Sequence, residues 1–279
     1  MTTVAILNPG AMGVTIGAAA KAGGSTVLWA AQGRGAATRA RAEAAGLEAR
    51  DNLAAVLAES DVVLSVCPPH AAVDLAHEVA GLGFAGLYVD GNAVAPATAL
   101  EIGQRVEVAG ARFIDGGIIG PPARHAGSTR LYLSGDGAPE AARLFQGSVL
   151  AAIVCGERPG AASALKMCYA AWTKGSAAML MAVRAAAEAE GVSAALTDEW
   201  ALSMPGLEAK SEDAAGHSAA KAWRFAGEMR EIADTFAANG LPAGFHQAAA
   251  ELYDCLASFK DAADLVALDA VIEVLNKKS

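Results

Sequence analysis

The sequence predicts an α/β protein in which a doubly wound parallel sheet is followed by an all-helical domain. Over residues 1–155, short β-branched apolar runs alternate with small-residue turns and helical stretches, as in sheets whose parallel strands are joined by helices. A glycine-containing turn links the first run to the first helical stretch. After Pro159-Gly160 no strand pattern reappears and the helical patterns continue. These three observations define the expected fold class.

The expected strands share short length and apolar, often β-branched composition. They are Thr3–Leu7, Thr26–Ala30, Val62–Val66, Leu87–Asp90, Arg112–Asp115, Arg130–Ser134 and Ala151–Val154. The run VVLSV at Val62–Val66 is apolar on both faces, which favours a sheet covered by helices on both sides. The helical stretches between the early strands are Met12–Ala22, Ala36–Ala45, Ala71–Ala80 and Ala95–Gln104.

The second half begins with one long expected helix. Ala161–Glu190 contains no proline and a single glycine, and Pro159 and Gly160 suit its start. Further helices follow, separated by turn signals at 204–206 and 239–242. The sequence therefore predicts two domains, residues 1–158 and residues 159–279.

Composition excludes several classes of protein. Hydrophobic residues make up 54% of the chain, which rules out disorder, and no run of 18 or more apolar residues predicts a membrane span. A formal net charge of −9 without a basic cluster predicts no nucleic-acid partner. No pair among the four cysteines has CxxC spacing, and the histidines show no metal-ligand pattern. Without a visible secretory signal, a cytoplasmic protein that holds no metal is expected.

The turn after the first strand has the character of a dinucleotide-binding loop. It reads Asn8-Pro9-Gly10-Ala11-Met12-Gly13, so two glycines take the second and third places of GxGxxG and an asparagine takes the first. Asparagine tolerates left-handed backbone better than most residues. We expect Gly10, Ala11, Met12 and Gly13 to cradle a pyrophosphate at the start of the following helix.

The end of the second strand predicts which nicotinamide cofactor is bound. NAD-preferring folds usually place an acidic residue there to bind the ribose 2′-hydroxyl, but Thr26–Arg34 contains none. Arg34 is instead suited to pair with a 2′-phosphate, with Gln32 nearby. The sequence therefore predicts NADP(H) over NAD(H).

Several longer segments carry a resemblance to a known group of enzymes. They are the GAMG loop at Gly10–Gly13, SVCPPHAAV at Ser65–Val73, VDGNAVAP at Val89–Pro96, FIDGGIIGPP at Phe113–Pro122 and GAASALKMCYAAWTKG at Gly160–Gly175. In order and spacing they resemble the β-hydroxyacid dehydrogenase superfamily, which includes 3-hydroxyisobutyrate and 6-phosphogluconate dehydrogenases, with imine reductases as relatives. Ala222–His246 resembles a branch of that superfamily with its own C-terminal helical domain.

The resemblance implies roles for individual residues. Cys67, Pro68 and His70 would lie along the nicotinamide ribose, and Asn92 would close over the nicotinamide end of the cofactor. Ile119 and Gly120 fall in the segment that binds substrate in the family. The C-terminal helices would form a homodimer.

Lys166 aligns with the catalytic lysine of the family and also has suitable surroundings. It lies in the apolar first turns of the long helix, where partial burial beside a substrate lowers a lysine pKa and suits the amine to proton transfer. Thr173 shares its helix face and Tyr169 flanks it. We expect Lys166 to be the catalytic residue and Tyr169 and Thr173 to contact substrate.

Three departures from the family pattern affect substrate binding. Ala170 stands where the family has asparagine, Ile119 replaces the serine that binds the substrate carboxylate, and Gly227-Glu228 replaces a Lys-Asp pair. Each change removes a polar group that holds a small carboxylate. Candidate replacements are Thr173, Arg124, His125 and Arg224.

These observations leave three hypotheses. The first is an NADPH-dependent oxidoreductase that interconverts a hydroxyl and a carbonyl on a small anionic substrate, with Lys166 carrying the proton. The second is an imine reductase of the same fold, which the lost polar groups favour and the retained Lys166 opposes. The third is a cofactor-binding protein without catalytic activity.

Overall fold

The computed structural model describes residues 1–260, 262 and 264–277. The chain divides into two compact units, Met1–Lys166 and Met167–Ser279. The first unit is built on an eight-stranded sheet. Its elements are β1 (Thr3–Ile6), α1 (Gly13–Ala22), β2 (Thr26–Ala30), α2 (Ala36–Ala44), β3 (Glu48–Arg50), α3 (Leu53–Ala58), β4 (Val62–Ser65), η1 (Pro69–Ala71), α4 (Ala72–Gly81), β5 (Leu87–Asp90), α5 (Pro96–Val108), β6 (Arg112–Ile119), β7 (Arg130–Ser134), α6 (Ala138–Arg143) and β8 (Ala151–Gly156).

The strand order is β3-β2-β1-β4-β5-β6-β7-β8, and the first six of these strands run parallel. The order reverses direction beside β1, where doubly wound sheets bind ligands at the carboxyl ends of their strands. The expected α/β class is confirmed. One pairing differs from an all-parallel sheet: β6 and β7 are antiparallel. The chain between them holds no helix among the described residues, and only an antiparallel return is possible without a crossover.

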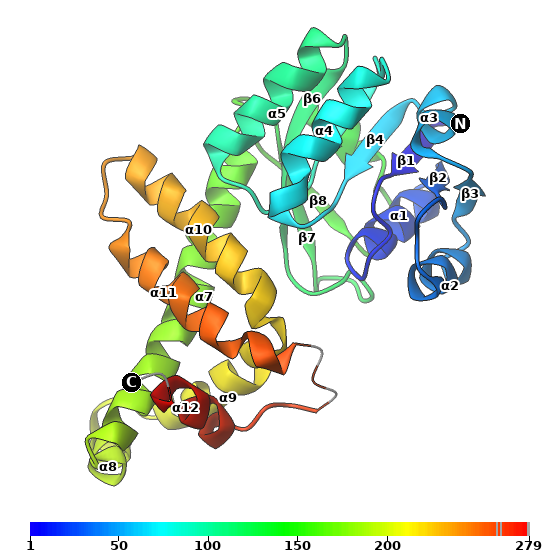
Figure 1. The fold of residues 1–279 in the computed structure, drawn as a ribbon. Helices are drawn as coiled ribbons and strands as arrows, with labels where there is room; N and C mark the ends of the chain where they lie inside the picture. Colours follow the sequence, from blue (N-terminus) through cyan, green and yellow to red (C-terminus); the bar gives the residue numbers. More distant parts are fainter. Residues whose placement is uncertain (261, 263, 278–279) are drawn as a thin grey trace. The chain divides into compact units, whose positions relative to one another are not determined.

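Helices cover both faces of the sheet. Alternate strand residues divide between two buried clusters, with Val4 and Ile6 in one and Ala5 and Leu7 in the other. The first cluster packs under α1 and α6, and the second packs under α3, α4 and α5. Figure 1 shows α4 and α5 side by side over one face. This two-sided burial explains why the strands are apolar on both faces.

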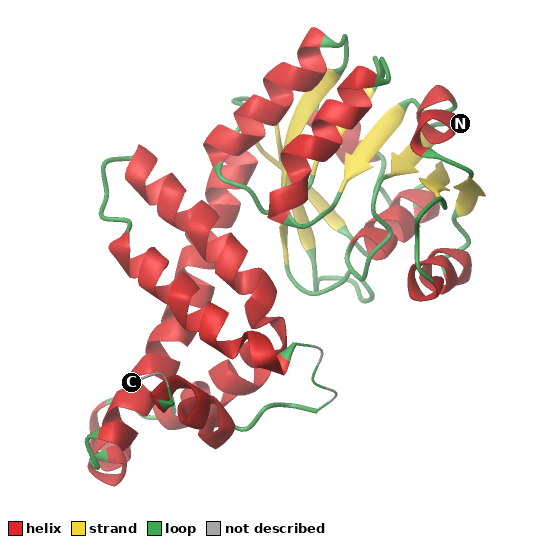
Figure 2. Cartoon of the chain, viewed as in Figure 1, coloured by secondary structure: helices red, strands yellow, loops and turns green. Residues whose placement is uncertain are grey.

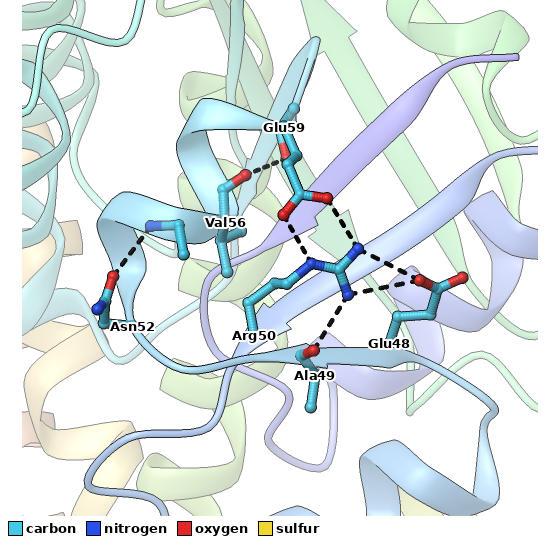
Figure 3. Close-up of polar contacts among 8 residues, drawn as sticks. Glu48, Ala49, Arg50, Asn52, Val56 and Glu59 are labelled. Atoms are coloured by element: carbon cyan, nitrogen blue, oxygen red, sulfur yellow. Dashed lines mark hydrogen bonds and ion pairs between the residues drawn. The ribbon is translucent and has the colours of Figure 1, made fainter.

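An edge strand that no sequence pattern predicted, β3, is held by charged residues. The Arg50 guanidinium donates to both carboxylate oxygens of Glu59, at 2.7 and 2.8 Å, and Glu48 lies on its other side (Figure 3). The Asn52 side chain accepts from the Ala55 amide and caps α3. Because β3 is short, polar and exposed, it carries no apolar run that would indicate a strand.

The second unit consists of helices among its described residues, whereas the strands in Figure 2 belong to the first unit. The elements are the long α7 (Ala161–Ala189), which begins in the first unit, α8 (Ser193–Ser203), α9 (Leu207–Ser218), η2 (Ala219–Lys221), α10 (Ala222–Ala238), α11 (Gly244–Cys255), η3 (Leu256–Phe259) and α12 (Leu268–Asn276). Tyr253 of α11 is fully buried and its hydroxyl donates to the Lys174 carbonyl of α7 at 2.9 Å. Within the described part of the chain, no helix is both long enough and apolar enough to cross a membrane.

The division between the units falls inside α7, after Lys166, whereas the sequence places it at residue 158. The first turns of α7 pack on the sheet: Ala162 and Ser163 are buried, and their backbone amides donate to Ser134 and Asp115 of β7 and β6. A helix that leaves one unit and enters the other carries no turn or linker at the division, so the sequence gives no signal there.

Candidate functional site: the carboxyl edge of the sheet and the start of α7

The glycine loop joins β1 to α1, and its two glycines serve different purposes. A Cβ on Gly13 would lie 2.0 Å from the Asn8 carbonyl oxygen, so the chain itself requires glycine there. A Cβ on Gly10 would meet no protein atom within 4 Å. The chain's own packing therefore does not require Gly10, whereas a pyrophosphate approaching the loop backbone does.

The loop ends at the uncapped start of α1. Met12 is the N-cap residue and makes no side-chain cap hydrogen bond, while Ala11 beside it is exposed. The Thr15 hydroxyl donates to the Met12 carbonyl at 2.8 Å and accepts from the Ala123 amide at 3.0 Å. This hydroxyl, which the sequence pattern did not single out, ties the β6–β7 segment to the start of α1. A helix start without a side-chain cap is suited to an anion.

Arg34 is held against the glycine loop. Its guanidinium donates to the Asn8 Oδ1 atom at 2.5 Å and to the Leu7 carbonyl at 3.1 Å. Asn8, which occupies the place of the first motif glycine, therefore orients the arginine. Gln32 lies in the same β2–α2 loop, with an exposed side chain and a backbone amide that donates to Asp51 at 2.9 Å.

A second arginine, Arg39 of α2, braces this loop and was not predicted. It donates to the Arg34 carbonyl at 3.0 Å and to the Ala31 carbonyl at 2.6 Å. The two contacts fix the loop on both sides of its glycine, Gly33, whose φ of 71° is left-handed. Arg39 lies one turn into a polar helix, and nothing in the sequence there indicates its contacts with the loop.

The loop after β4 contains Cys67, Pro68 and His70. The Asn92 side chain shapes it: its Oδ1 atom accepts from the Cys67 amide at 2.6 Å, and its Nδ2 atom donates to Ser65 at 3.0 Å and to Asp90. Because Asn92 is buried, its amide acts on the loop from within the protein. Burial, reinforced by the Asp90 charge, raises the pKa of the Cys67 thiol to about 12, so this cysteine stays protonated. Pro68 is partly buried and His70 is exposed.

Four buried polar residues form a row across the carboxyl edge of the sheet. Ser65, Asp90, Asp115 and Ser134 are register partners on β4, β5, β6 and β7, and each is at most 1% exposed. We call them the polar row. Burial, reinforced by the neighbouring Asp115, raises the pKa of Asp90 to about 8. Asp90 is therefore mostly protonated at neutral pH, which avoids two adjacent buried negative charges.

Lys166 rests on β6 at a position that only glycine allows. A Cβ on Gly117 would lie 2.7 Å from the Ala162 carbonyl oxygen and 3.0 Å from the Lys166 Cβ atom. The half-buried lysine stem therefore lies directly on the strand, beside the carboxyl edge that carries the polar row. The fold thus brings Lys166 to the segment in which the sequence placed substrate.

The expected substrate residues fall in both units. In the first unit, Ile119 is buried at the end of β6, and Gly120 has a φ of 123° and lies so close to Ser128 that a Cβ would come within 2.3 Å of its carbonyl oxygen. In the second unit, Tyr169 and Thr173 are exposed on α7, and the Thr173 hydroxyl donates to the Tyr169 carbonyl at 3.1 Å.

The other candidate replacements have separate surroundings. Arg124 and His125 are exposed in the β6–β7 loop of the first unit. Arg224 lies on α10 in the second unit beside the Trp223 ring, at 5.9 Å from its centroid. Ala170 is fully buried and offers no polar group.

The Gly227-Glu228 pair has a defined partner within the second unit. Glu228 of α10 forms an ion pair with Lys174 of α7, and both side chains are less than 15% exposed. The Lys174 ammonium also lies 4.6 Å from the centroid of the Phe225 ring. Both contacts join the Lys174 side chain of α7 to α10.

Comparison with family models gives two matches. Residues 3–151 match the NAD binding domain of 6-phosphogluconate dehydrogenase. Residues 187–256 match a domain of unknown function, DUF1932. The first match covers the glycine loop, Arg34, the Cys67 loop and the polar row. The expectation of a nicotinamide-binding domain followed by a separate helical domain of its own branch is confirmed.

Individual relatives agree with these matches. An uncharacterised 28.5 kDa protein of Methanothermus fervidus is 30% identical over 161 residues, which are 58% of this chain and 61% of that protein, so the chain spans less than two thirds of that relative. A solved protein of unknown function, described as similar in structure to 3-hydroxyacid dehydrogenases, is 25% identical with a TM-score of 0.69, over 92% of this chain and 97% of its own.

Two solved enzymes share the fold at lower identity. The 3-hydroxyisobutyrate dehydrogenase of Mycobacterium tuberculosis, solved with L-serine, is 23% identical with a TM-score of 0.70, over 99% of both chains. An imine reductase of Myxococcus stipitatus, solved with NAD+, is 17% identical with a TM-score of 0.56, over 99% of this chain and 100% of its own.

Proposed function

Because the chain belongs to the family of the NAD binding domain of 6-phosphogluconate dehydrogenase, we propose that it is an NADPH-dependent oxidoreductase. The proposed reaction interconverts a hydroxyl and a carbonyl on a small anionic substrate. The observation that carries the proposal is the placement of Lys166 on Gly117, at the sheet edge that also carries the glycine loop.

The residues of the first unit fit a dinucleotide. Gly10 leaves open space where a side chain would stand, and α1 begins without a side-chain cap, so Gly10, Ala11, Met12 and Gly13 are proposed to hold the pyrophosphate. Arg34, with Gln32 beside it, is proposed to bind the 2′-phosphate. Cys67, Pro68 and His70 would line the ribose, and Asn92 would fix their loop. A nicotinamide bound by these residues would supply hydride transfer.

Lys166 is proposed to move the proton. Alcohol oxidation requires a base for the hydroxyl proton, and carbonyl reduction requires the corresponding acid. An amine on a half-buried stem at the sheet edge can serve as the base in one direction and, once protonated, as the acid in the other. Ile119 and Gly120, at the end of β6, are proposed to shape the substrate pocket.

An imine reductase is the second candidate function. The buried Ala170 and Ile119 favour it, because neither offers a polar group to a carboxylate. A substrate panel separates the two candidates: small hydroxyacids are tested with NADP+, and cyclic imines are tested with NADPH. Turnover of hydroxyacids supports the first function. Turnover confined to imines replaces it with the second, and NADPH binding without any turnover favours a non-catalytic cofactor-binding protein.

Arg34→Ala is expected to weaken NADPH binding about 10- to 100-fold, because a charge-assisted contact to a phosphate contributes about 1.5–3 kcal/mol. NADH affinity is expected to stay within about twofold, since NADH lacks that phosphate. Cofactor fluorescence titration measures both affinities. Arg112→Ala is the matched control, because this arginine is exposed and pairs with Glu140. Equal loss for both cofactors would mean that Arg34 supports the loop without selecting the phosphate.

A homodimer through the helical unit is proposed from one face of α7. Tyr169, Trp172 and Met179 lie along this face and are 48%, 74% and 44% exposed. A twofold contact brings the same patch of two copies together. The uncharged aromatic and apolar side chains of this face are complementary to themselves, so a second copy is the occupant that we propose.

Trp172→Glu is expected to convert the dimer to a monomer, because two copies of the carboxylate would meet at the contact and be desolvated there. Sedimentation velocity at micromolar concentration measures the change. Leu202→Glu is the control, because Leu202 is 81% exposed on α8. A wild-type protein that sediments as a monomer contradicts the proposal, as does a Trp172→Glu variant that stays dimeric.

A further inference from the structure

Asp115 stands between the sheet and the helix that carries Lys166. Its Oδ2 atom accepts from the Ser163 amide at 3.0 Å and from the Ser134 hydroxyl at 2.9 Å, and its Oδ1 atom accepts from the Ser163 hydroxyl at 2.5 Å. In all three contacts a carboxylate oxygen accepts from an N–H or O–H donor. The fully buried Asp115 side chain therefore joins the start of α7 to β7.

Ser134 extends this contact to a second backbone amide. Its oxygen accepts from the Ala162 amide at 3.0 Å while its hydroxyl donates to Asp115. Two successive amides of the first turn of α7 are thus satisfied by the polar row. A negative charge at a helix N-terminus is also stabilised by the helix dipole.

The next turn of α7 is fixed by the same strand. Gly117 follows Asp115 by two residues on β6, so both face the same side of the sheet. Ser163 and Lys166 are three residues apart on α7 and share a helix face. Asp115 holds Ser163, and Gly117 allows the Lys166 Cβ atom close to the strand. These two contacts set the position of the lysine stem along the sheet edge.

Burying two adjacent carboxyl groups costs free energy. Asp90 and Asp115 are nevertheless both buried. Asp90 is satisfied by Asn92, whose backbone amide donates to its Oδ1 atom at 3.3 Å, and Asn92 in turn holds the Cys67 loop. The polar row therefore connects the loop proposed to line the ribose with the start of α7. An apolar row would pack as well but would provide neither contact.

We infer that Asp115 is a positioning residue, which places the Lys166 amine by anchoring the first turn of α7 through Ser163 and Ser134. This inference rests on the proposed catalytic role of Lys166. Asp115 acts on the reaction through Lys166, and it contributes to the rate rather than to the binding of substrate or cofactor. A displacement of about 1 Å at a reacting group costs roughly 100-fold in rate.

The test compares three full-length variants with the wild type. Asp115→Asn keeps the side-chain shape and places an amide against the Ser163 donors. Ser163→Ala removes one donor and leaves Asp115 in place, and Ser163→Thr restores the hydroxyl. Each variant is measured for kcat, KM, NADPH affinity and the rate at which formaldehyde and cyanoborohydride methylate Lys166. The exposed Lys210 of α9 is the internal reference for labelling.

We expect kcat to fall about 10- to 100-fold in Asp115→Asn and to fall less in Ser163→Ala, with KM and NADPH affinity within about threefold. The Lys166 labelling rate should change by about threefold or more in both, relative to Lys210. Ser163→Thr should retain wild-type values for every measurement. Where Asp115→Asn does not fold, the Ser163 pair decides the result.

Wild-type kcat and Lys166 labelling in Ser163→Ala, or in folded Asp115→Asn, would overturn the inference. Equal losses in Ser163→Ala and Ser163→Thr would also overturn it, because packing and not the hydroxyl would then matter. If the wild type turns over no substrate, the proposed function fails, whereas the labelling rates still show whether Asp115 places Lys166.

Discussion

Replacement of Lys166 by alanine is expected to lower kcat about 100- to 10,000-fold, the contribution of a positioned general acid or base. NADPH affinity should stay within about threefold, since the residues proposed to hold the cofactor come from the glycine loop, the β2–α2 loop and the Cys67 loop. Steady-state kinetics with the best substrate of the panel and fluorescence titration of NADPH measure the two effects.

Two further variants show what the amine contributes. Lys166→Arg keeps the cation, but a guanidinium does not release its proton near neutral pH, so this variant should be nearly as slow as Lys166→Ala. Lys210→Ala removes an exposed lysine of α9 and should match the wild type. Substantial turnover by Lys166→Ala would remove Lys166 from the reaction.

Local patterns identify the candidate site residues whose signal lies in neighbouring residues of the chain. Gly10 and Gly13 stand out because a strand leads into them and a helix follows, and the structure gives Gly13 the close contact that the motif implies. Arg34 stands out because no acidic residue occupies the end of the second strand. In both cases the prediction depends on residues within one short turn, so the sequence pattern of that turn is enough to make it.

Contacts between distant segments were not predictable in this way. Asp115, Ser134 and Ser163 become neighbours only because β7 returns antiparallel beside β6 and the first turn of α7 then packs on both strands. Residues 112–115 were expected as the strand, but β6 continues to Ile119 because the antiparallel partner pairs with the extra residues. The role of Asn8 likewise depends on a guanidinium that lies 26 positions later in the chain.

Some elements and contacts were not predicted because their residues lack a characteristic pattern. β3 is charged and exposed, and α3 and α6 are short, so none of them has the apolar period that identifies a strand or an amphipathic helix. Arg39 looks like any charged residue of a surface helix, although its two contacts brace the loop around Arg34. Such contacts depend on long side chains reaching backbone carbonyls, which leave no pattern in the residue order.

The two loop glycines separate the requirements of the chain from those of the ligand. Gly13→Ala places a Cβ 2.0 Å from the Asn8 carbonyl oxygen, and such overpacking costs about 1–3 kcal/mol, so Tm should fall by roughly 2–10 °C. NADPH binding should also fall at least about tenfold, because the displaced Asn8 no longer orients Arg34. Differential scanning fluorimetry and fluorescence titration measure the two changes.

Gly10→Ala is the matched control, because its new methyl group meets no protein atom within 4 Å. The Tm of this variant without cofactor should stay within about 2 °C of the wild type, while NADPH affinity falls about tenfold or more, since the methyl group occupies space proposed for the pyrophosphate. The stabilisation that NADPH normally gives should be lost with the affinity, because ligand binding raises Tm by mass action. Normal NADPH binding by Gly10→Ala would place the pyrophosphate away from this loop, and the proposed cofactor site would then be wrong even with Arg34 in place.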